Sequence, residues 1–319
     1  MRIGLDIMGG DFTPEEAIKG LAAYFKDEKE EDKSIHFHLI GASDIAEPFL
    51  YHLKGFEDRY TIIPSDSVIS MNEHPTKALK EKTNSSIAIG FKQLLMKEIQ
   101  AFASAGNTGA MLVGSLYSVK AIPGIIRPTI ASPIPNINGA WSFLLDAGAN
   151  SDCKAEHLYQ FAKIGSLYAK KVLNIENPRV GLLNIGTEEG KGNLLAQASY
   201  SLLKQSNYIN FIGNIEGRDV FTDVADIIVC DGYTGNIILK MAESFYDIFA
   251  IEKGIEDPFL KNFNYENFGG TPVLGINANV FIGHGISKAP AFKNMIKNTI
   301  ELVKGDVIQS LNKLFKPEN

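Results

Sequence analysis

Five short segments of the chain combine glycine with Asn, Asp, Ser or Thr, residue types suited to anion binding through backbone N–H groups and neutral donors. These segments are MGGD (8–11), SAGNTGA (104–110), DAGAN (146–150), NIGTEEGKGN (184–193) and CDGYTGN (230–236). Each segment alone fits a tight turn or a helix N-cap equally well. Taken together, the five segments predict an anion site, and phosphate is the anion that we expect there.

The segment NIGTEEGKGN lies between an apolar run and a helical pattern, which is the layout of a nucleotide-binding P-loop. Gly186 and Gly190 are separated by three residues, however, where that motif requires four. Lys191 is followed by Gly192, so no hydroxyl group is placed to bind magnesium. MGGD also lacks the G-x-G-x-x-G spacing of dinucleotide-binding loops. Nucleotide binding is therefore disfavoured.

Short apolar runs, typical of strands, alternate along the chain with helical patterns, and these elements must position the five loops. This alternation predicts an α/β fold with a largely parallel sheet covered by helices on both faces. Because the carboxyl ends of parallel strands share one edge of a sheet, we expect the five loops to meet. We expect one domain over 1–319, with a helical excursion at about 237–268. The predicted strands are 2–6, 36–41, 60–64, 100–103, 142–145, 179–184, 209–213, 226–230, 273–276 and 280–283, and the predicted helices are 13–25, 43–54, 84–98, 109–122, 156–173, 194–204, 236–252 and 291–303.

The first predicted helix has a specific start signal. Thr13 is expected to be its N-cap, with Pro14 at the first helical position and Glu16 closing a capping box.

Composition excludes several classes of protein. The chain has 319 residues and a formal net charge of −6, and no arm or block of Lys and Arg indicates nucleic-acid binding. The two cysteines, Cys153 and Cys230, predict buried thiols in a reducing compartment. The N-terminus is not a signal peptide, and no apolar stretch reaches the roughly 18 residues of a membrane span. We expect a cytoplasmic protein without a metal or cofactor, and leave association with a membrane open.

The ordered set of motifs resembles one family along nearly the whole chain. The motifs include "LDIMGGD", in which the family usually has Ala in place of Ile7, "SAGNTGA", "NPRVGLLNIGTEEGKGN", "NFIGNIEGRD", "VCDGYTGNIILK" and "YENFGGTPVLGIN". The chain resembles the acyl-ACP:phosphate acyltransferases of bacterial phospholipid synthesis, the PlsX family. The resemblance implies an isopropylmalate-dehydrogenase-like three-layer α/β/α sandwich and a homodimer.

The resemblance also implies a reaction and its partners. Fatty acyl-ACP and inorganic phosphate would give acyl phosphate and free acyl carrier protein. A membrane glycerol-3-phosphate acyltransferase would then consume the acyl phosphate. No cofactor is implied.

This reaction must place phosphate beside a thioester carbonyl and stabilise the oxyanion that forms. Lys191 is expected to offset phosphate charge, and His284 to protonate the departing thiolate. Asp146 and Asn150 are the other two residues expected in catalysis, and the acidic residues of the loops either orient donors or act as acid/base. The residues expected to bind phosphate or substrate are Gly9, Gly10, Asp11, Ser104, Asn107, Thr108, Asn184, Thr187, Asn193, Asp231 and Asn236.

The segment 237–268 supports a separate hypothesis. Its apolar stripe follows helical spacing and consists of Ile238, Met241, Phe245, Ile248 and Phe249. In the family this region contacts the membrane or lines an acyl site. Here it is shorter and less basic, so core packing or dimerisation is preferred to membrane contact.

Two other functions remain open at this point. One is a phosphotransacetylase that acts on short-chain acyl-CoA. The other is a peripheral membrane scaffold that recruits lipid-synthesis enzymes through 237–268, which would leave the five loops unexplained.

Overall fold

The computed structural model describes residues 1–316, and the chain divides into two compact units. The first unit comprises Met1–Ala121 and Tyr265–Lys304, and the second comprises Ile122–Asn264 and the segment that starts at Gly305. Each unit is thus built from two separate stretches of chain. The assignment of 1–319 to a single domain stays a prediction.

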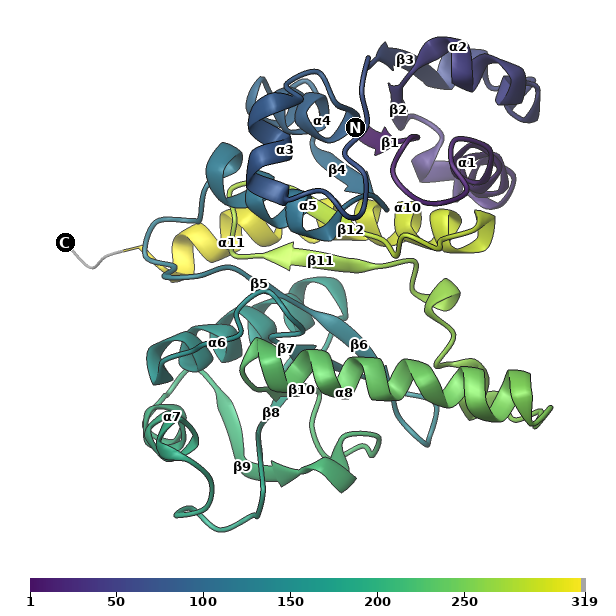
Figure 1. Ribbon diagram of the computed structural model, residues 1–319. Coiled ribbons are helices and arrows are strands. Elements are labelled where there is room, and N and C mark those ends of the chain that lie inside the picture. The colour runs from purple at the N-terminus through teal and green to yellow at the C-terminus, as the bar shows by residue number, and fades with distance from the viewer. Residues whose placement is uncertain (317–319) are drawn as a thin grey trace. The chain divides into compact units, whose positions relative to one another are not determined.

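The first unit is built on parallel strands in the order β3-β2-β1-β4-β12-β11, in which only the β11–β12 pair is antiparallel (Figure 1). Three of these strands have the predicted bounds, because each apolar run is flanked by polar residues or glycine. Side chains of β1 and β4 are buried on both faces, as expected for central parallel strands. The bounds are β1 Arg2–Asp6, β2 His36–Gly41, β3 Tyr60–Pro64, β4 Ala101–Ser104, β11 Thr271–Leu274 and β12 Asn279–Ile282.

The helices of this unit are α1 Glu15–Asp27, α2 Ser43–Ala46, α3 Pro75–Glu81, α4 Ser86–Leu95, α5 Thr108–Gly114 and α10 Ala289–Lys304. The predicted helix 43–54 is only four residues long and continues as a 3₁₀ turn, with Pro48 at the junction. Proline has no N–H to donate into an α-helical turn, which accounts for the change. The helix α3 was not predicted.

The capping box predicted at Thr13 is wrong. The Thr13 hydroxyl donates to the carbonyl of Gly10 at 2.9 Å, and no side chain caps α1. The Glu16 carboxylate instead accepts from the backbone N–H of Ala289 at 2.8 Å. The start of α1 is therefore tied to the start of α10, a long-range contact that local spacing does not encode.

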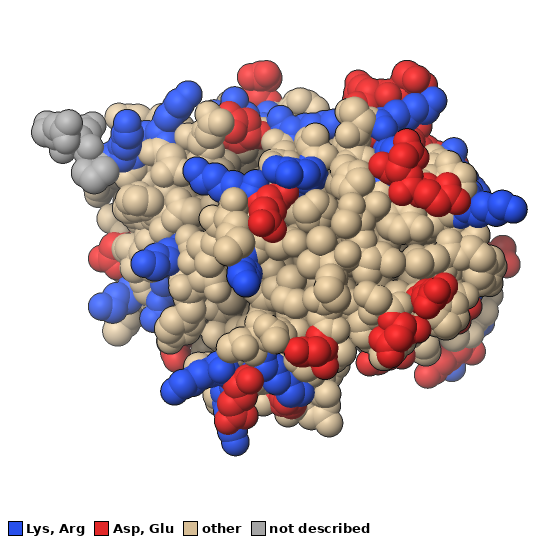
Figure 2. Space-filling model, turned by 90° about the horizontal axis from the view of Figure 1, so that it is seen from above, with Lys and Arg blue, Asp and Glu red and all other residues tan. Residues whose placement is uncertain are grey.

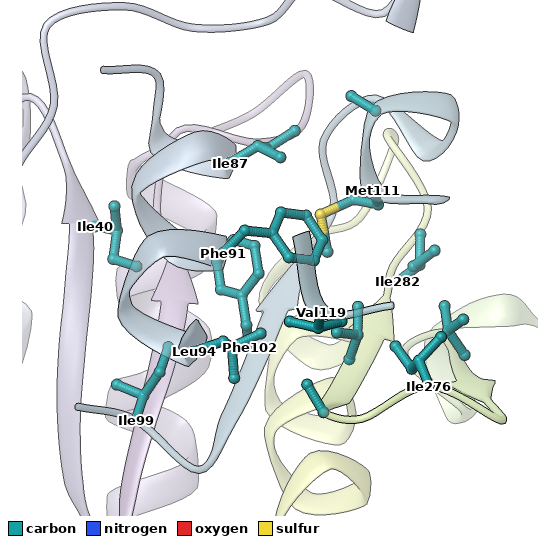
Figure 3. Packing of buried hydrophobic residues seen from close by; sticks show 14 of the residues in the cluster. Ile40, Ile87, Phe91, Leu94, Ile99, Phe102, Met111, Val119, Ile276 and Ile282 are labelled. Carbon is teal, nitrogen blue, oxygen red and sulfur yellow. The ribbon is translucent and has the colours of Figure 1, made fainter. Parts of the chain in front are cut away.

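One core of this unit lies where α4 packs against the sheet (Figure 3). The rings of Phe91 and Phe102 meet edge to face with centroids 5.6 Å apart. Met111 and Ile282 extend the cluster toward α5 and β12. This packing holds the carboxyl ends of β4 and β12 next to α5.

The second unit has its own sheet, with strand order β6-β7-β10-β8-β9 and only the β6–β7 pair antiparallel. The strands are β6 Ser132–Pro135, β7 Trp141–Leu145, β8 Arg179–Asn184, β9 Asn210–Glu216 and β10 Ile227–Val229, and the two-residue β5 spans Thr129–Ile130. The helices are α6 Ala155–Val172, α7 Leu194–Lys204, α8 Gly232–Phe245, α9 Pro258–Lys261 and α11 Val307–Leu314. Helix α6 packs against α7, α11 and β10.

The α/β class and the largely parallel strands are confirmed, but the expectation of one sheet needs correction. The strands before MGGD and SAGNTGA belong to the first unit, and those before DAGAN, NIGTEEGKGN and CDGYTGN belong to the second. The five loops therefore lie at the carboxyl edges of two sheets. Strand patterns reveal burial but not which strands pair, so the sequence did not show this division.

The segment 237–268 holds the end of α8, a π-helical turn at Tyr246–Glu252, and α9 (Figure 1). The ring of Phe245 packs against Phe221 at 5.7 Å and Phe263 at 5.6 Å. Met241 and Phe249 are exposed. The predicted apolar stripe thus divides into a packed side and an open side. Among residues 1–316, no helix is long and apolar enough to cross a membrane.

Acidic and basic side chains are interspersed on the face drawn in Figure 2. Within the first unit, ion pairs join helices to their neighbours: Lys293 pairs with Asp27, and Lys304 pairs with the buried Asp32. These pairs join α10 to α1 and to the turn that follows α1.

Candidate functional site

The first group of predicted site residues surrounds Asp6, the last residue of β1. Its carboxylate is fully buried and accepts from the Met8 N–H at 2.9 Å and from the Ser104 hydroxyl at 2.6 Å. Burial raises the pKa of Asp6, and the hydrogen bonds from Ser104 and Met8 lower it in part. Ser104 also accepts from the Gly106 N–H at 3.0 Å. Asp6 and Ser104 therefore join the loops that follow β1 and β4.

The loop MGGD is held tightly on both sides. A Cβ on Gly9 would lie 2.5 Å from the Asp6 carboxylate and 2.6 Å from the Gly106 nitrogen, so only glycine fits there. Gly10 has φ +121°, and the next residue, Asp11, donates its N–H to the carbonyl of Gly285 at 2.7 Å. The Asp11 side chain is exposed.

Asn107, predicted to contact phosphate, uses both polar atoms of its side chain in hydrogen bonds within the first unit. Its side-chain oxygen caps α5 by accepting from the Ala110 N–H at 2.9 Å. Its amide nitrogen donates to the carbonyls of Ser70 at 2.9 Å and Met71 at 3.1 Å, and lies 3.2 Å from that of Glu73. This side chain therefore clamps the loop before α3 to the start of α5. The neighbouring Thr108 is exposed at the first position of α5.

His284 lies in the loop after β12, next to the MGGD loop. Its ring is half-buried and stands 5.1 Å from the ring of Tyr265, at an interplanar angle of 43°. Its carbonyl accepts from the Ser287 N–H at 3.0 Å. Thus the first unit gathers Gly9, Gly10, Asp11, Ser104, Asn107, Thr108 and His284 at one edge of its sheet.

The second group surrounds Asp146, which follows β7. Its carboxylate is fully buried and accepts from Thr129 and Ile130 on one oxygen, at 3.1 and 2.9 Å. Its other oxygen accepts from the backbone and side-chain nitrogens of Asn150, at 2.6 and 3.0 Å. Burial raises the pKa of Asp146, and the bonds from Ile130 and Asn150 oppose that rise. Of the two roles left open for the acidic residues, this geometry matches orientation of donors.

Asn150 links the DAGAN loop to Pro128 and to the start of α8. Its amide also donates to the carbonyl of Pro128 at 2.8 Å, and its own carbonyl accepts from the Gly232 N–H at 2.8 Å. Gly232 and Gly235 begin α8, and a Cβ on Gly235 would overlap the carbonyl oxygen of Asp146. The amino end of α8 therefore packs directly on DAGAN.

Asp231 and Asn236 lie at this same helix start. Asp231 caps α8, accepting from the N–H of Thr234 at 2.8 Å and from its hydroxyl at 3.0 Å. Asn236 is exposed, and its side chain lies about 3.5 Å from the place of a Cβ on Gly148. The loops DAGAN and CDGYTGN thus meet, as predicted for loops at one edge of a sheet.

The loop NIGTEEGKGN closes on itself. Asn184 donates to the carbonyl of Lys191 at 3.1 Å, and Asn193 caps α7 by accepting from the Ala196 N–H at 2.9 Å. Thr187 and Lys191 are exposed, and the Lys191 ammonium lies 4.0 Å from the Glu188 carboxylate. Of the predicted side chains in this loop, Asn184 and Asn193 make hydrogen bonds that shape it, whereas Thr187 and Lys191 are exposed.

A cavity of about 860 Å³ opens beside this loop, entirely within the second unit. Its lining comes from β8, β9, α6, α7, α8 and the residues that follow β10, and includes the predicted residues Asn184, Asn193 and Asp231. Its size falls within the range of small-molecule sites. The other lining residues are Leu158, Leu182, Leu183, Ile185, Gly192, Leu195, Ala196, Glu216, Gly217, Arg218, Cys230, Thr234 and Ile238.

Sequence reasoning missed most of these lining residues, because it followed polar loop residues. One signal was available: Ile185 is a bulky apolar residue within an otherwise polar, glycine-rich stretch. In the structure it lines the cavity and is 83% exposed. Exposed apolar side chains at the edge of a cavity indicate contact with another apolar group.

The two thiols also lie in this unit. Burial raises the pKa of Cys153 to about 11 and that of Cys230 well above its ordinary value. Neither thiol is therefore poised as a nucleophile near neutral pH. Within residues 1–316, no group of three His, Cys, Asp or Glu side chains is placed to hold a metal ion.

The chain is similar to proteins of one family over almost its full length. Residues 1–310 match the family model described as "Fatty acid synthesis protein". A protein named phosphate acyltransferase from Dictyoglomus turgidum is 40% identical over 336 residues, covering 98% of each chain. Another protein of that name, from Halothermothrix orenii, is 43% identical over 336 residues, covering 98% of this chain and 99% of its own.

Solved structures share the fold at much lower identity. A phosphotransacetylase from Streptococcus pyogenes superimposes with a TM-score of 0.64 and 20% identity, covering 95% of this chain and 94% of its own. A branched-chain phosphotransacylase from Enterococcus faecalis V583 superimposes with a TM-score of 0.63 and 13% identity, and the match covers 95% of this chain and 99% of its own. These likenesses confirm the predicted fold class.

Proposed function

We propose, because the chain belongs to the phosphate acyltransferase family, that it transfers the acyl group of a fatty acyl thioester to inorganic phosphate. A phosphate oxygen would attack the thioester carbonyl, a C–O bond would form, and the C–S bond would break. The products are acyl phosphate and a thiol, whose sulfur takes up a proton. The observation that carries this proposal is the match over residues 1–310, together with relatives about 40% identical along the chain.

The acyl donor in this proposal is acyl carrier protein loaded with a fatty acid. The sequence resemblance described above supports this choice, as it supports a cytoplasmic homodimer. A membrane glycerol-3-phosphate acyltransferase would consume the product. The exposed apolar side chains Met241, Ile248 and Phe249 are the residues we propose for a peripheral membrane contact.

Several residues have proposed roles in the chemistry. Lys191 would offset the phosphate charge, since its ammonium is exposed and only loosely paired with Glu188. Thr187 would donate to phosphate from the same loop. His284 would protonate the leaving thiolate. Asp146 and Asn150 would act as positioning residues, because their polar atoms bond to the loops around them.

The test is an assay with palmitoyl-ACP and inorganic phosphate, in which hydroxylamine traps acyl phosphate as the hydroxamate. We expect hydroxamate and free thiol to form in equal amounts, and only when phosphate is present. If neither forms with the folded protein, the proposed function is wrong.

A second donor separates the proposal from a short-chain phosphotransacetylase. The same assay with acetyl-CoA should give a rate far below that with palmitoyl-ACP. A higher rate with acetyl-CoA would assign the chain to short-chain acyl transfer instead.

A further inference from the structure

The cavity in the second unit is apolar at its base. Leu158, Leu182 and Cys230 line it and are 2%, 1% and 3% exposed, which places them deep in the fold. They come from α6, from β8 and from the residue after β10. Leu195 of α7 and Ile238 of α8 add two further apolar side chains, both half-buried. A ligand that enters this cavity meets hydrocarbon from five elements.

The polar groups lie where strands end and helices begin, at the carboxyl edge of the sheet. Asn184 is the last residue of β8, Asn193 caps α7 and Asp231 caps α8. The apolar Ile185 follows Asn184, also lines the cavity and is largely exposed. The cavity thus combines an apolar base with a rim of mixed polar and apolar side chains.

The charges of the lining do not suit an anion. Glu216 and Asp231 contribute carboxylates, and Arg218 is the one lining cation. The Arg218 guanidinium is largely exposed and paired with Glu216. A phosphate group inside the cavity would therefore face two carboxylates against one cation that is already paired, and like charges repel. An uncharged, apolar ligand has no such cost.

We propose that this cavity holds the hydrocarbon tail of the acyl group, and that Leu195 and Ile238 limit the tail length. This inference rests on the proposed function and extends it by assigning the tail a site. The phosphate would then bind outside the cavity, and the thioester would lie near the rim. The loop NIGTEEGKGN would contribute Ile185 to the tail and Thr187 and Lys191 to the polar reactants.

Chain-length preference is the property that reports on this cavity. Each methylene group moved from water into an apolar site improves binding about fourfold. Replacing Ile238 or Leu195 by Phe adds bulk to the lining and should exclude at least two methylene groups. We expect the ratio of kcat/KM for palmitoyl to that for octanoyl donors to fall at least tenfold in Ile238→Phe and Leu195→Phe. The KM for phosphate should stay within about twofold of its wild-type value.

The chain offers a matched control for each variant. Ile237→Phe and Leu194→Phe make the same change one residue earlier on the same helices, at positions that are 50% and 85% exposed. Neither Ile237 nor Leu194 lines the cavity. Both controls should keep the wild-type chain-length ratio within about twofold.

A binding measurement gives a readout that does not depend on turnover. The probe is N-phenyl-1-naphthylamine, an uncharged dye whose fluorescence rises in an apolar site. We expect saturable binding to the wild type and both controls, and at least tenfold weaker binding to Ile238→Phe and Leu195→Phe. Should a Phe variant fail to fold by circular dichroism, Ile238→Ala and Leu195→Ala replace it, and their chain-length optimum should move to longer acyl groups.

The outcomes separate the two proposals. An active wild type whose folded cavity variants keep both the chain-length ratio and the probe affinity overturns the tail site alone. A wild type that binds the probe at this cavity but forms no acyl phosphate overturns the proposed reaction and keeps an apolar-ligand site. Equal losses in the cavity variants and their controls would also overturn the tail site.

Discussion

Asp6 and Asp146 occupy comparable places in the two units, since each lies at the carboxyl end of a strand and is fully buried. They differ in their donors. Asp6 accepts from one N–H and one hydroxyl, whereas Asp146 accepts from three N–H groups and one hydroxyl. A hydroxyl can reverse its role and accept, but an N–H group cannot. We therefore expect the hydrogen bonds around Asp146 to require a carboxylate. Those around Asp6 should also form with the neutral amide of asparagine.

The largest effect is expected where a helix meets the Asp146 loop. Gly235→Ala would place a Cβ on the carbonyl oxygen of Asp146, and backbone must move to relieve the overlap. We expect a loss of about 3 kcal/mol in the free energy of unfolding, measured by urea denaturation. Gly217→Ala is the control, because a Cβ there meets nothing within 4 Å. Equal stability of the two variants would contradict the packing described for α8.

Asp146→Asn should have the next largest effect. The new amide nitrogen would face N–H donors from either Ile130 or Asn150, so a buried donor would lose its acceptor. This loss costs about 2 kcal/mol. Asp152→Asn, an exposed change in the next turn of chain, should shift the stability by less than about 0.5 kcal/mol. A tolerated Asp146→Asn would remove the contrast with Asp6.

Asp6→Asn should cost about 1 kcal/mol or less at pH 7, because the Ser104 hydroxyl can accept from the new amide. Denaturation at pH 7 gives the comparison with Asp146→Asn. Ser104→Ala should cost less in the Asp6→Asn background than in the wild type, because the hydroxyl then bonds a neutral amide and not a carboxylate.

The wild type and the Asp6→Asn variant together test the direction of the Asp6 pKa shift. Burial raises the pKa of Asp6 in the folded state, so the folded protein takes up a proton before the unfolded chain does as pH falls. The stability gained from protonating Asp6 is fully present below the pKa of the unfolded state, and it is lost as the pH rises through the pKa of the folded state. The wild type should therefore gain stability relative to Asp6→Asn as pH is lowered from 7 toward 4. A constant difference across that range would show that the folded-state pKa is not raised.

The smallest effect on stability is expected at Lys191. Lys191→Ala should change the free energy of unfolding by less than about 0.5 kcal/mol, because its side chain is exposed. If it offsets phosphate charge, the KM for phosphate should rise about fivefold, the equivalent of about 1 kcal/mol. Lys191→Arg should restore most of that loss. An unchanged KM in Lys191→Ala would assign the residue to the solvated surface of the loop.

Local patterns predicted single elements well. The strands at 2–6, 36–41 and 60–64 have the expected bounds, and the first two contain a run of buried apolar residues. The strand β6 was missed because its segment SPIP contains two prolines, which are tolerated only at an edge such as this one. Sheet membership was missed because it depends on pairing between distant segments.

The candidate site shows a similar limit. The predicted polar residues do gather at strand ends, but Asn107, Asn193 and Asp231 cap helices, which is the other role such residues take in loops. Composition cannot separate a cap from a ligand contact, since both use the same side-chain atoms. The apolar cavity was invisible for a different reason: Leu158, Leu182 and Ile238 resemble ordinary core residues until the fold leaves a space between them.

The interleaved chain of the two units affects the order of folding during synthesis. The second unit has all five strands of its sheet once residue 229 has left the ribosome. In the first unit, β4 must wait for β12, where Ser104 pairs with Ile282, some 180 residues later. The N-terminal strands are thus made first, but their sheet is completed last. During that interval one side of β4 lacks its partner, so nascent chains stalled before residue 279 should be the most prone to aggregate or to recruit chaperones.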